Sequence, residues 1–476
     1  MGEHIFGVLS LHAEGGSGVV GYAEMGQKFR GGGGGGRTQS RTHGSLRLCP
    51  HLNACFLLLT NTADRAAALA LPVRVARPYH PAMSLRDLWT LDPAVTFLNH
   101  GSYGACPRAV LDVQAKYRER LERQPVQFLG RDLEPLLASA RETVGSFLGV
   151  PGRDIGFVHN ATGGVNTVLR SLRFERGDEL LITDHAYNAC ANALERAAAQ
   201  DGATVVIVHI PLPVRSEEDV LEAVMERVTS RTRRALLDHV TSPTALVFPI
   251  ARLLSELQSR GIDCLVDGAH APGMVDLNLA ELGAAYYTGN GHKWLCSPKG
   301  AAFLYVRPDR QERIRPLTIS HGANAELRGR TRFEAEFSWV GTQDPSAWLC
   351  LAESISYMGS LLPGGWPEVR QRNRDLAIAA GGLLNDRMSA EPLCPESMLG
   401  SIASVALPGR GVTDPDPTKW ADPLQGELLT EFGIEVPIFR WGDPPQRLLR
   451  VSAQLYNSFE QYERLAEALE AKGFGQ

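Results

Sequence analysis

From about residue 106 the chain alternates short apolar runs with longer amphipathic stretches, and this alternation constrains the fold most. The apolar runs have the length and composition of strands, and the stretches between them have the period of helices. Such alternation predicts an α/β fold with a mostly parallel sheet and helices on both faces. The seven predicted strands are Ile155–His159, Glu179–Thr183, Thr204–His209, Arg234–His239, Cys264–Asp267, Ala284–Thr288 and Ala301–Val306. The predicted helices are Gly163–Ser171, Asn188–Ala199, Ser216–Val228 and Ile250–Arg260.

The same patterns divide the chain into four segments. Residues 106–344 form the predicted large domain, and residues 83–105 form an N-terminal segment near the functional site. Residues 345–476 form a smaller α+β domain, with helices near 346–362, 366–387 and 460–472 and strands near 402–407 and 448–452. Residues 1–82 contain a six-glycine run and irregular apolar pieces, and they are predicted to be a disordered extension. Their GxGxxG match at 16–21 leaves no room for the helix of a dinucleotide fold.

Composition narrows the possible functions. The net charge of -5 and the pI near 6.2 give no global basic field, so nucleic-acid binding is not expected. No apolar run approaches the roughly 20 residues that span a bilayer, so no membrane association is expected. The eight cysteines are scattered, without a CxxC pair or a His spacing suited to zinc. We interpret them as reduced thiols of a cytoplasmic protein that holds no metal.

Two polar side chains follow neighbouring predicted strands. Asp267 ends one apolar run, and Lys293 lies in a Gly-rich turn after the next. Pyridoxal 5'-phosphate (PLP) needs a lysine for the Schiff base with its aldehyde and a carboxylate that keeps its pyridinium nitrogen protonated. The alternatives are a helix cap for Asp267 and a solvated surface position for Lys293. Because only six of the 48 basic residues are lysines and only lysine forms an imine, the pair predicts PLP as cofactor and Lys293 as catalytic residue.

The stretch Asn160–Asn166 follows a predicted strand and opens a helix. Its free backbone N–H groups, the Thr162 hydroxyl and the positive helix end suit a phosphate. A plain helix cap is the alternative. The chain has no GxxxxGK[ST] motif, which disfavours a nucleotide triphosphatase.

Seven short motifs, in order, resemble those of the class V PLP-dependent aminotransferases, and within them the isopenicillin N epimerase group. They are Leu98–Gly104, Asp184–Asn188, His239–Thr244, Asp267–His270, Gly291–Lys293, Phe337–Asp344 and Arg450–Ser452. The resemblance covers about residues 84 to 472. It implies the PLP-dependent transferase fold type I, an amino-acid substrate and a homodimer.

The resemblance also implies a set of cofactor contacts. They are Thr162, Gly163, His185, Ser242, Asp267, His270, His292, Lys293, Gly341 and Thr342. In this set His185 would stack on the pyridine ring, with Tyr187 as the competing aromatic. Gly341 and Thr342 would reach the phosphate bound by the other subunit. A structural role is the alternative for each histidine.

For the substrate, the resemblance implies that Arg450 pairs with the α-carboxylate, a geometry that guanidinium fits better than ammonium. Asn99 and His100 are also assigned to substrate binding. Cysteine desulfurases of this superfamily carry a nucleophilic cysteine on a loop before this arginine. The corresponding stretch Gly433–Gly442 has none, which disfavours persulfide transfer.

The sequence leaves the reaction open. Lys293, released as a free amine, is the expected base for the α-carbon proton. Reprotonation on the opposite face gives epimerisation, loss of a β-substituent gives a C–S lyase, and proton delivery to the cofactor carbon gives transamination. Epimerase-type chemistry is slightly favoured over the C–S lyase. A noncatalytic binding protein is disfavoured, because every position that the resemblance assigns to the cofactor carries a residue suited to that role.

Overall fold

The computed structural model describes residues 84–408 and 422–475, which belong to one compact unit. The predicted disordered extension and its GxGxxG match lie outside the described residues. In the part of the chain that is described, no helix is long and apolar enough to cross a membrane.

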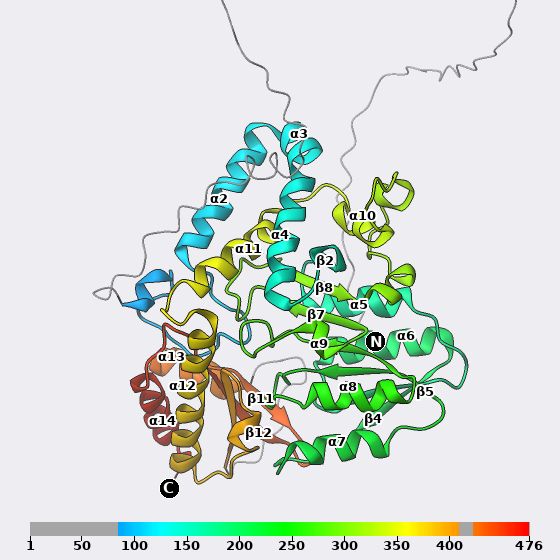
Figure 1. The fold of residues 1–476 in the computed structure, drawn as a ribbon. Coiled ribbons are helices and arrows are strands. Elements are labelled where there is room, and N and C mark those ends of the chain that lie inside the picture. The colour runs from blue at the N-terminus through cyan, green and yellow to red at the C-terminus, as the bar shows by residue number, and fades with distance from the viewer. Residues whose placement is uncertain (1–83, 409–421, 476) are drawn as a thin grey trace, which may run out of the picture. The chain divides into compact units, whose positions relative to one another are not determined.

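A seven-stranded sheet forms the centre of the larger part, with the order β2-β8-β7-β6-β5-β3-β4 (Figure 1). All neighbouring pairs are parallel except those that β8 makes with β2 and β7. The strands are β2 (Ile155–Val158), β3 (Glu179–Thr183), β4 (Thr204–Val208), β5 (Thr232–Asp238), β6 (Asp263–Asp267), β7 (Tyr286–Asn290) and β8 (Ala302–Val306). The predicted mostly parallel sheet is therefore confirmed. Two strands differ from their predicted bounds by two residues: β7 is displaced, because its pairing with β6 begins at Tyr286, and β5 begins earlier, at Thr232.

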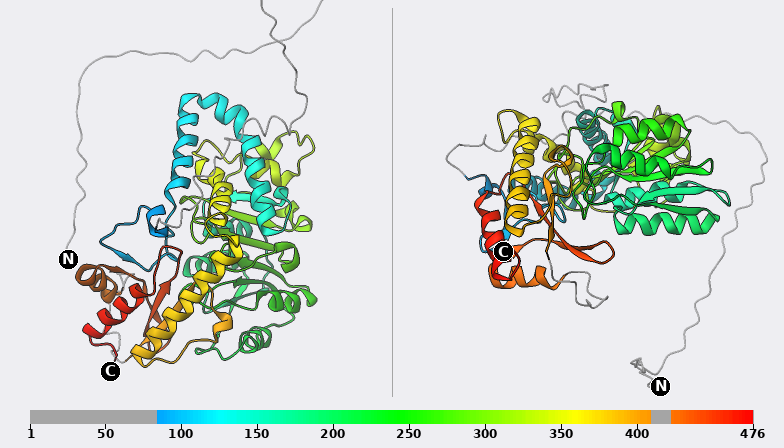
Figure 2. Two further views of the ribbon diagram at one scale, coloured as in Figure 1. Left: turned by 60° about the vertical axis from the view of Figure 1, so that its left-hand side comes forward. Right: turned by 90° about the horizontal axis from the view of Figure 1, so that it is seen from below.

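Helices cover both faces of this sheet, and the alternation of side chains explains why the strands are apolar throughout (Figure 2). Along β3, Leu180 and Ile182 pack in one core with α5 (Ala161–Ser171) and α6 (Asn188–Asp201). Leu181 lies in the opposite core, which includes α8 (Ile250–Ser259) and α7 (Glu217–Glu226).

Several elements were not predicted from the sequence. The helices α2 (Arg108–Arg123) and α4 (Leu133–Leu148) both pack on α11 (Ser346–Gly359), with α3 (Pro125–Gln127) and the π-helical turn η2 (Phe128–Asp132) between them (Figure 1). The buried residues of α2 are Val110, Gln114 and Tyr117, and the rest of the helix is mostly polar. Residues of α11 belong to the core of the large sheet.

The C-terminal domain has an antiparallel three-stranded sheet in the order β11-β12-β9. Its strands are β9 (Ile402–Leu407), β11 (Ile438–Trp441) and β12 (Gln446–Ser452), and its helices are α12 (Gly365–Met388), α13 (Pro423–Phe432) and α14 (Glu460–Ala471). The N-terminal segment joins this part of the chain, because β1 (Thr96–Phe97) pairs in parallel with β10 (Ile434–Glu435). This pairing places the Leu98–Gly104 motif between the two sheets.

The remaining short elements complete the described chain. They are η1 (Leu85–Leu88), η3 (Gly152–Asp154), α9 (Leu279–Leu282), η4 (Pro308–Arg313), η5 (His321–Asn324), α10 (Arg332–Ser338) and η6 (Glu396–Met398).

Candidate active site

A cavity of about 490 Å³ lies at the carboxyl ends of the central parallel strands, where α/β sheets usually bind ligands. Asp238, Asp267 and Asn290 end three adjoining strands at this edge. Other residues that line it are Asn99, Ser102, Tyr103, Asn160, Thr162, Tyr187, Ser242, His270, His292, Lys293, Lys299 and Phe439. The structure therefore brings seven of the predicted site residues to one cavity: Asn99, Thr162, Ser242, Asp267, His270, His292 and Lys293.

Lys293 follows β7 and lies beside His270, with 2.9 Å between its Nζ and the Nε2 of the histidine. Burial, and after it the nearby Arg450, lower the pKa of Lys293 to about 7, while Asp267 opposes this shift. The indole N–H of Trp294 can only donate, and it points to His270 Nδ1 at 3.4 Å. His270 Nε2–H is then free to donate to an unprotonated Lys293 amine.

The carboxylate of Asp267 accepts two hydrogen bonds at the end of β6. The backbone N–H of Ala269 donates to Oδ1 at 2.9 Å, and the Cys190 thiol donates to Oδ2 at 3.0 Å. Asp267 is therefore fixed in orientation and aimed at the cavity that it lines.

Asp238 was missed by the sequence analysis, although it also ends a strand and lines the cavity. It pairs in register with Asp267 across β5 and β6. Burial raises the pKa of Asp238 well above its usual range, and the neighbouring charge of Asp267 adds to this effect. The signal in the sequence was its position one residue before His239, at the end of a strand beside the Asp267 strand.

The start of α5 leaves one backbone donor free for an anion. Asn160 Oδ1 accepts from the N–H of Gly163 at 2.8 Å, and the N–H of Ala161 donates to Asn290 Oδ1 at 2.9 Å. The N–H of Thr162 has no partner among the described residues and opens on the cavity. Gly163 lies outside the cavity lining, and its N–H is used by the cap.

His292 supplies a second unsatisfied group at the cavity. Its buried Nδ1 has no hydrogen-bond partner in the described part of the chain. Burial lowers the pKa of His292 to about 4, with Lys293 and Lys299 as further causes. A buried polar atom without a partner is costly, so a ligand is expected to satisfy it. Thr162, His292 and the helix end together fit a phosphate group.

Arg450 is 1% exposed and has no carboxylate partner in residues 84–408 and 422–475. Its Nη1 donates to the backbone and hydroxyl oxygens of Ser242 at 2.7 and 3.0 Å, and its Nη2 donates to Ser102 Oγ at 3.0 Å. The guanidinium lies 5.0 Å from the Phe439 ring centre, and its Nε is unsatisfied. An uncompensated buried cation is costly, and an anionic ligand removes this cost. Burial lowers the pKa of Arg450 to about 10.

Two histidines do not occupy their predicted places. His185 is fully buried, with Nδ1 bonded to Thr244 Oγ1 and Nε2 to the Ile210 carbonyl at 2.8 and 3.0 Å. It does not line the cavity, whereas Tyr187, two residues later, does. His100 is also fully buried and does not line the cavity. Its ring nitrogens bond instead to the Tyr456 hydroxyl and the Lys293 carbonyl. Neither histidine is part of the cavity lining.

Gly341 and Thr342 lie away from the cavity of their own chain. Gly341 has a φ of +108°, and Thr342 is exposed at a separate hollow that also includes Pro125, Val126 and Trp339. Nothing in the single chain brings them near Lys293.

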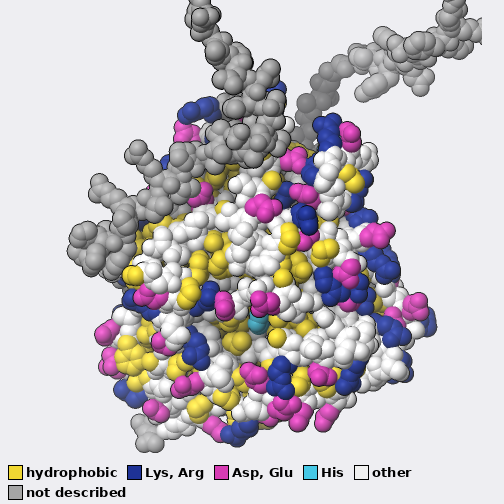
Figure 3. All heavy atoms as spheres, in the orientation of Figure 1, with side chains coloured by type: hydrophobic (Ala, Val, Ile, Leu, Met, Phe, Trp, Pro, Cys, Tyr) yellow, Lys and Arg dark blue, Asp and Glu magenta, His cyan; other side chains and the backbone are white. Residues whose placement is uncertain are grey.

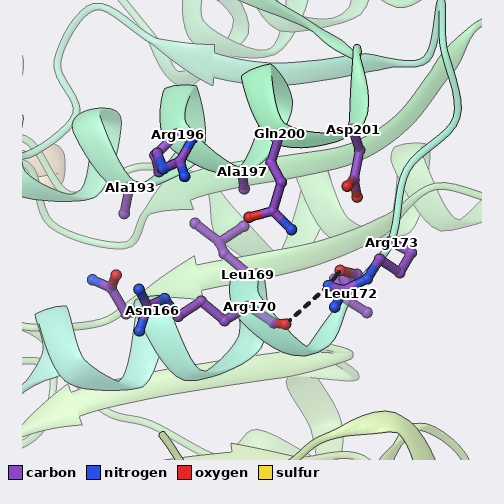
Figure 4. A pocket seen from close by; sticks show the side chains of 10 residues that line it. All are labelled: Asn166, Leu169, Arg170, Leu172, Arg173, Ala193, Arg196, Ala197, Gln200 and Asp201. Atoms are coloured by element: carbon purple, nitrogen blue, oxygen red, sulfur yellow. Dashed lines mark hydrogen bonds between the residues drawn. The ribbon is translucent and has the colours of Figure 1, made fainter.

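A further cavity, of about 310 Å³, lies between α5 and α6 (Figure 4). Three arginines line it: Arg170, Arg173 and Arg196. Arg173 Nη1 donates to the Arg170 carbonyl at 3.2 Å, and Asp201 places a carboxylate in the same hollow. None of the predicted site residues lines this cavity.

On the face shown in Figure 3, acidic and basic side chains are interspersed.

The fold, the Lys293–Asp267 pair and the unsatisfied phosphate donors define a PLP-dependent enzyme of fold type I. A family model for aminotransferase class-V matches residues 97–414, and the chain belongs to this family. The isopenicillin N epimerase of Amycolatopsis lactamdurans is 37% identical over 398 residues, which cover 81% of this chain and 96% of that protein. A probable chloroplastic L-cysteine desulfhydrase of Arabidopsis thaliana is 32% identical over 401 residues, which cover 79% of this chain and 83% of that protein.

Solved structures support the same fold. The cystine C-S lyase C-DES, in complex with cysteine persulfide, is similar with a TM-score of 0.66 at 21% identity. The similarity covers 80% of this chain and 98% of that chain.

Proposed function

We propose that this PLP enzyme removes and returns the α-carbon proton of an amino acid, as an epimerase does, with Lys293 as cofactor-bearing lysine and base. One observation carries the proposal: an amine with a pKa of about 7 lines a cavity, and directly behind two serines of its lining, Ser102 and Ser242, lies the buried Arg450 guanidinium, which has no carboxylate partner among the described residues. Bound PLP supplies an electron sink that makes the α-carbon proton removable. The guanidinium supplies the matching site for the α-carboxylate.

The residues that would hold the cofactor follow from their positions. Asp267 would hold the ring nitrogen, and Tyr187 replaces His185 as the aromatic neighbour of the ring because only Tyr187 lines the cavity. The residues proposed for the remaining polar contacts are Thr162, Ser242, His270 and His292, with Gly163 supporting the helix end.

The protein's own groups account for binding and proton transfer. Arg450 binds the α-carboxylate, and the hydroxyls of Ser102 and Ser242 keep its guanidinium in place. Lys293 is about half unprotonated near pH 7, so its Nζ can accept a proton at that pH. His270, bonded to Nζ, orients the amine.

The reaction is tested in heavy water with a panel of L- and D-amino acids and β-substituted amino acids. Epimerisation returns the inverted amino acid with deuterium at the α-carbon, as resolved by chiral chromatography and mass spectrometry. Lys293→Ala is the matched control and should give neither product. Stoichiometric keto acid and ammonia, without label in the recovered amino acid, would replace the epimerase proposal with the C–S lyase.

The C–S lyase is the second candidate, favoured by the desulfhydrase relative at 32% identity. Within the described residues all six cysteines are buried, and none lines the 490 Å³ cavity. A lyase reaction here would therefore proceed by elimination from the substrate, without a protein-bound persulfide. Cysteine as substrate with mass spectrometry of the intact protein distinguishes the two routes.

We also propose a homodimer in which Gly341 and Thr342 serve the site of the partner subunit. Thr342 lies in an apolar hollow of about 480 Å³ beside Val126, which is 69% exposed. Exposed apolar surface of this kind often marks an interface. We place the enzyme in the cytoplasm, because the described cysteines are all free thiols.

A further inference from the structure

His100 lies behind the active-site lysine rather than in the cavity. Its Nε2 is 2.9 Å from the Lys293 carbonyl oxygen, and its Nδ1 is 2.7 Å from the Tyr456 hydroxyl. The imidazole also packs against the Trp294 ring, with ring centres 4.9 Å apart and ring planes tilted by 45°. The ring is fully buried, so it exchanges no hydrogen bond with solvent.

These contacts fix the tautomer of His100. Burial lowers its pKa to about 3, so the ring is neutral and has a single N–H. The Lys293 carbonyl can only accept, which requires the proton on Nε2. Nδ1 then accepts from the Tyr456 hydroxyl. Gln454 Nε2, 3.4 Å from His100 Nε2, is the weaker neighbour and donates to Cys296 instead.

The loop that carries His100 is pressed against the lysine turn. A Cβ added to Gly104 would lie 2.3 Å from the His292 carbonyl oxygen and 2.9 Å from the Lys293 carbonyl oxygen. Lys299 Nζ donates to the Gly104 carbonyl at 2.6 Å, which is a second link between this loop and the segment after Lys293. The loop is therefore in backbone contact with the turn that presents Lys293.

We propose that His100, oriented by Tyr456, is a positioning residue that holds the main chain of Lys293 so that its amine faces His270. This inference rests on Lys293 being the cofactor-bearing lysine, as proposed above. The Tyr456–His100–Lys293 connection links three distant parts of the chain: the C-terminal domain, the N-terminal segment and the turn after β7. Displacement of the lysine backbone is expected to bring the amine toward solvent and raise its pKa toward that of an ordinary lysine.

The test uses purified full-length apoprotein and measures the rate of covalent PLP attachment as a function of pH, by borohydride trapping and peptide mapping. This rate depends on the free amine and does not depend on which reaction the enzyme catalyses. The variants are His100→Asn, His100→Gln and Tyr456→Phe. Glutamine can place an N–H donor at the Nε2 position, whereas asparagine is too short.

His100→Asn and Tyr456→Phe are expected to lower the attachment rate at pH 7 by about tenfold, the effect of one lost buried hydrogen bond. Both should shift the pH midpoint upward from about 7. His100→Gln should stay within about twofold of the parent. Tyr462→Phe is the matched control, because it removes a buried hydroxyl that donates to the Ser452 carbonyl at 2.7 Å without touching His100. It should lower the unfolding temperature and leave the midpoint unchanged.

The inference fails if His100→Asn and Tyr456→Phe lower only the unfolding temperature, as Tyr462→Phe does, or if His100→Gln is as impaired as His100→Asn. An adduct that maps to another lysine overturns the lysine assignment and this inference together. If the adduct maps to Lys293 but the enzyme proves to be a lyase, only the proposed reaction is overturned.

Discussion

Asp238 and Asp267 end adjacent parallel strands in register, and both line the same cavity. Two buried carboxyl groups in such a position cannot both be charged without a large cost, so one retains a proton. The groups that face Asp238 are Asp267, the Tyr187 backbone N–H and Lys293. Burial and Asp267 outweigh the other two, and the pKa of Asp238 is raised well above its usual range.

This arrangement predicts how stability changes with pH in the apoprotein. Between the unfolded pKa of about 3.9 and the raised folded pKa, the folded state binds more protons at Asp238 than the unfolded state does. The contribution of Asp238 to the free energy of unfolding therefore falls as pH rises through this window. Asp238→Asn should gain stability relative to the parent as pH increases, as measured by urea unfolding. In the surface variant Asp276→Asn, the free energy of unfolding should change with pH as it does in the parent. The same result for Asp238→Asn would contradict a raised pKa of Asp238.

The second prediction concerns the covalent attachment of PLP. Two lysines line the cavity, Lys293 and Lys299, and only Lys293 has its amine beside His270. Lys293→Arg should abolish the borohydride-stable adduct, because guanidinium does not form the imine. Lys299→Arg keeps the charge and should retain the adduct. Mapping of the adduct to Lys299 in the parent protein would refute the assignment.

The third prediction concerns recognition of the α-carboxylate. Arg450→Gln should raise KM for amino acids about 30- to 1000-fold, because a charge-assisted bidentate contact contributes roughly 2–4 kcal/mol. The PLP content should stay near that of the parent. Arg440→Gln, on the exposed side of β11, is the control and should leave KM unchanged. Steady-state kinetics of the two variants separate these outcomes, and an unaltered KM for Arg450→Gln would exclude the proposed role.

The fourth prediction concerns shared sites in a homodimer. Lys293→Ala chains and Thr342→Ala chains should each be impaired alone, and mixing them after partial unfolding and refolding should restore activity. The restored site combines Lys293 of one chain with Thr342 of the other. Light scattering should give the mass of a dimer. A fully active monomer, or mixtures no better than the separate variants, would argue that each chain is self-sufficient.

The sequence predicted the sheet well because its central strands are buried on both faces and read as continuous apolar runs. The mostly polar helix α2 was not predicted. Asp267 and Lys293 were found because Asp267 ends one strand and Lys293 lies in the turn after the next. Asp238 was overlooked because its partner is defined by strand order, which a pattern along the chain does not contain. The burial of His100 and His185 was not predictable for the same reason: their hydrogen-bond partners, such as Tyr456 and Ile210, are distant in sequence or lie in another element.

The pairing of β1 with β10 has a consequence for biosynthesis. Asn99, which lines the cavity, donates to Glu435 at 3.1 Å across 336 positions of sequence. The residues on the N-terminal side of this contact are made first, yet they remain without their partner strand until residues 434–435 have been synthesised. A contact of such long range closes late in folding. The cavity wall to which Asn99 belongs therefore cannot be completed before β10 has been made, and PLP should be incorporated only after that point in synthesis.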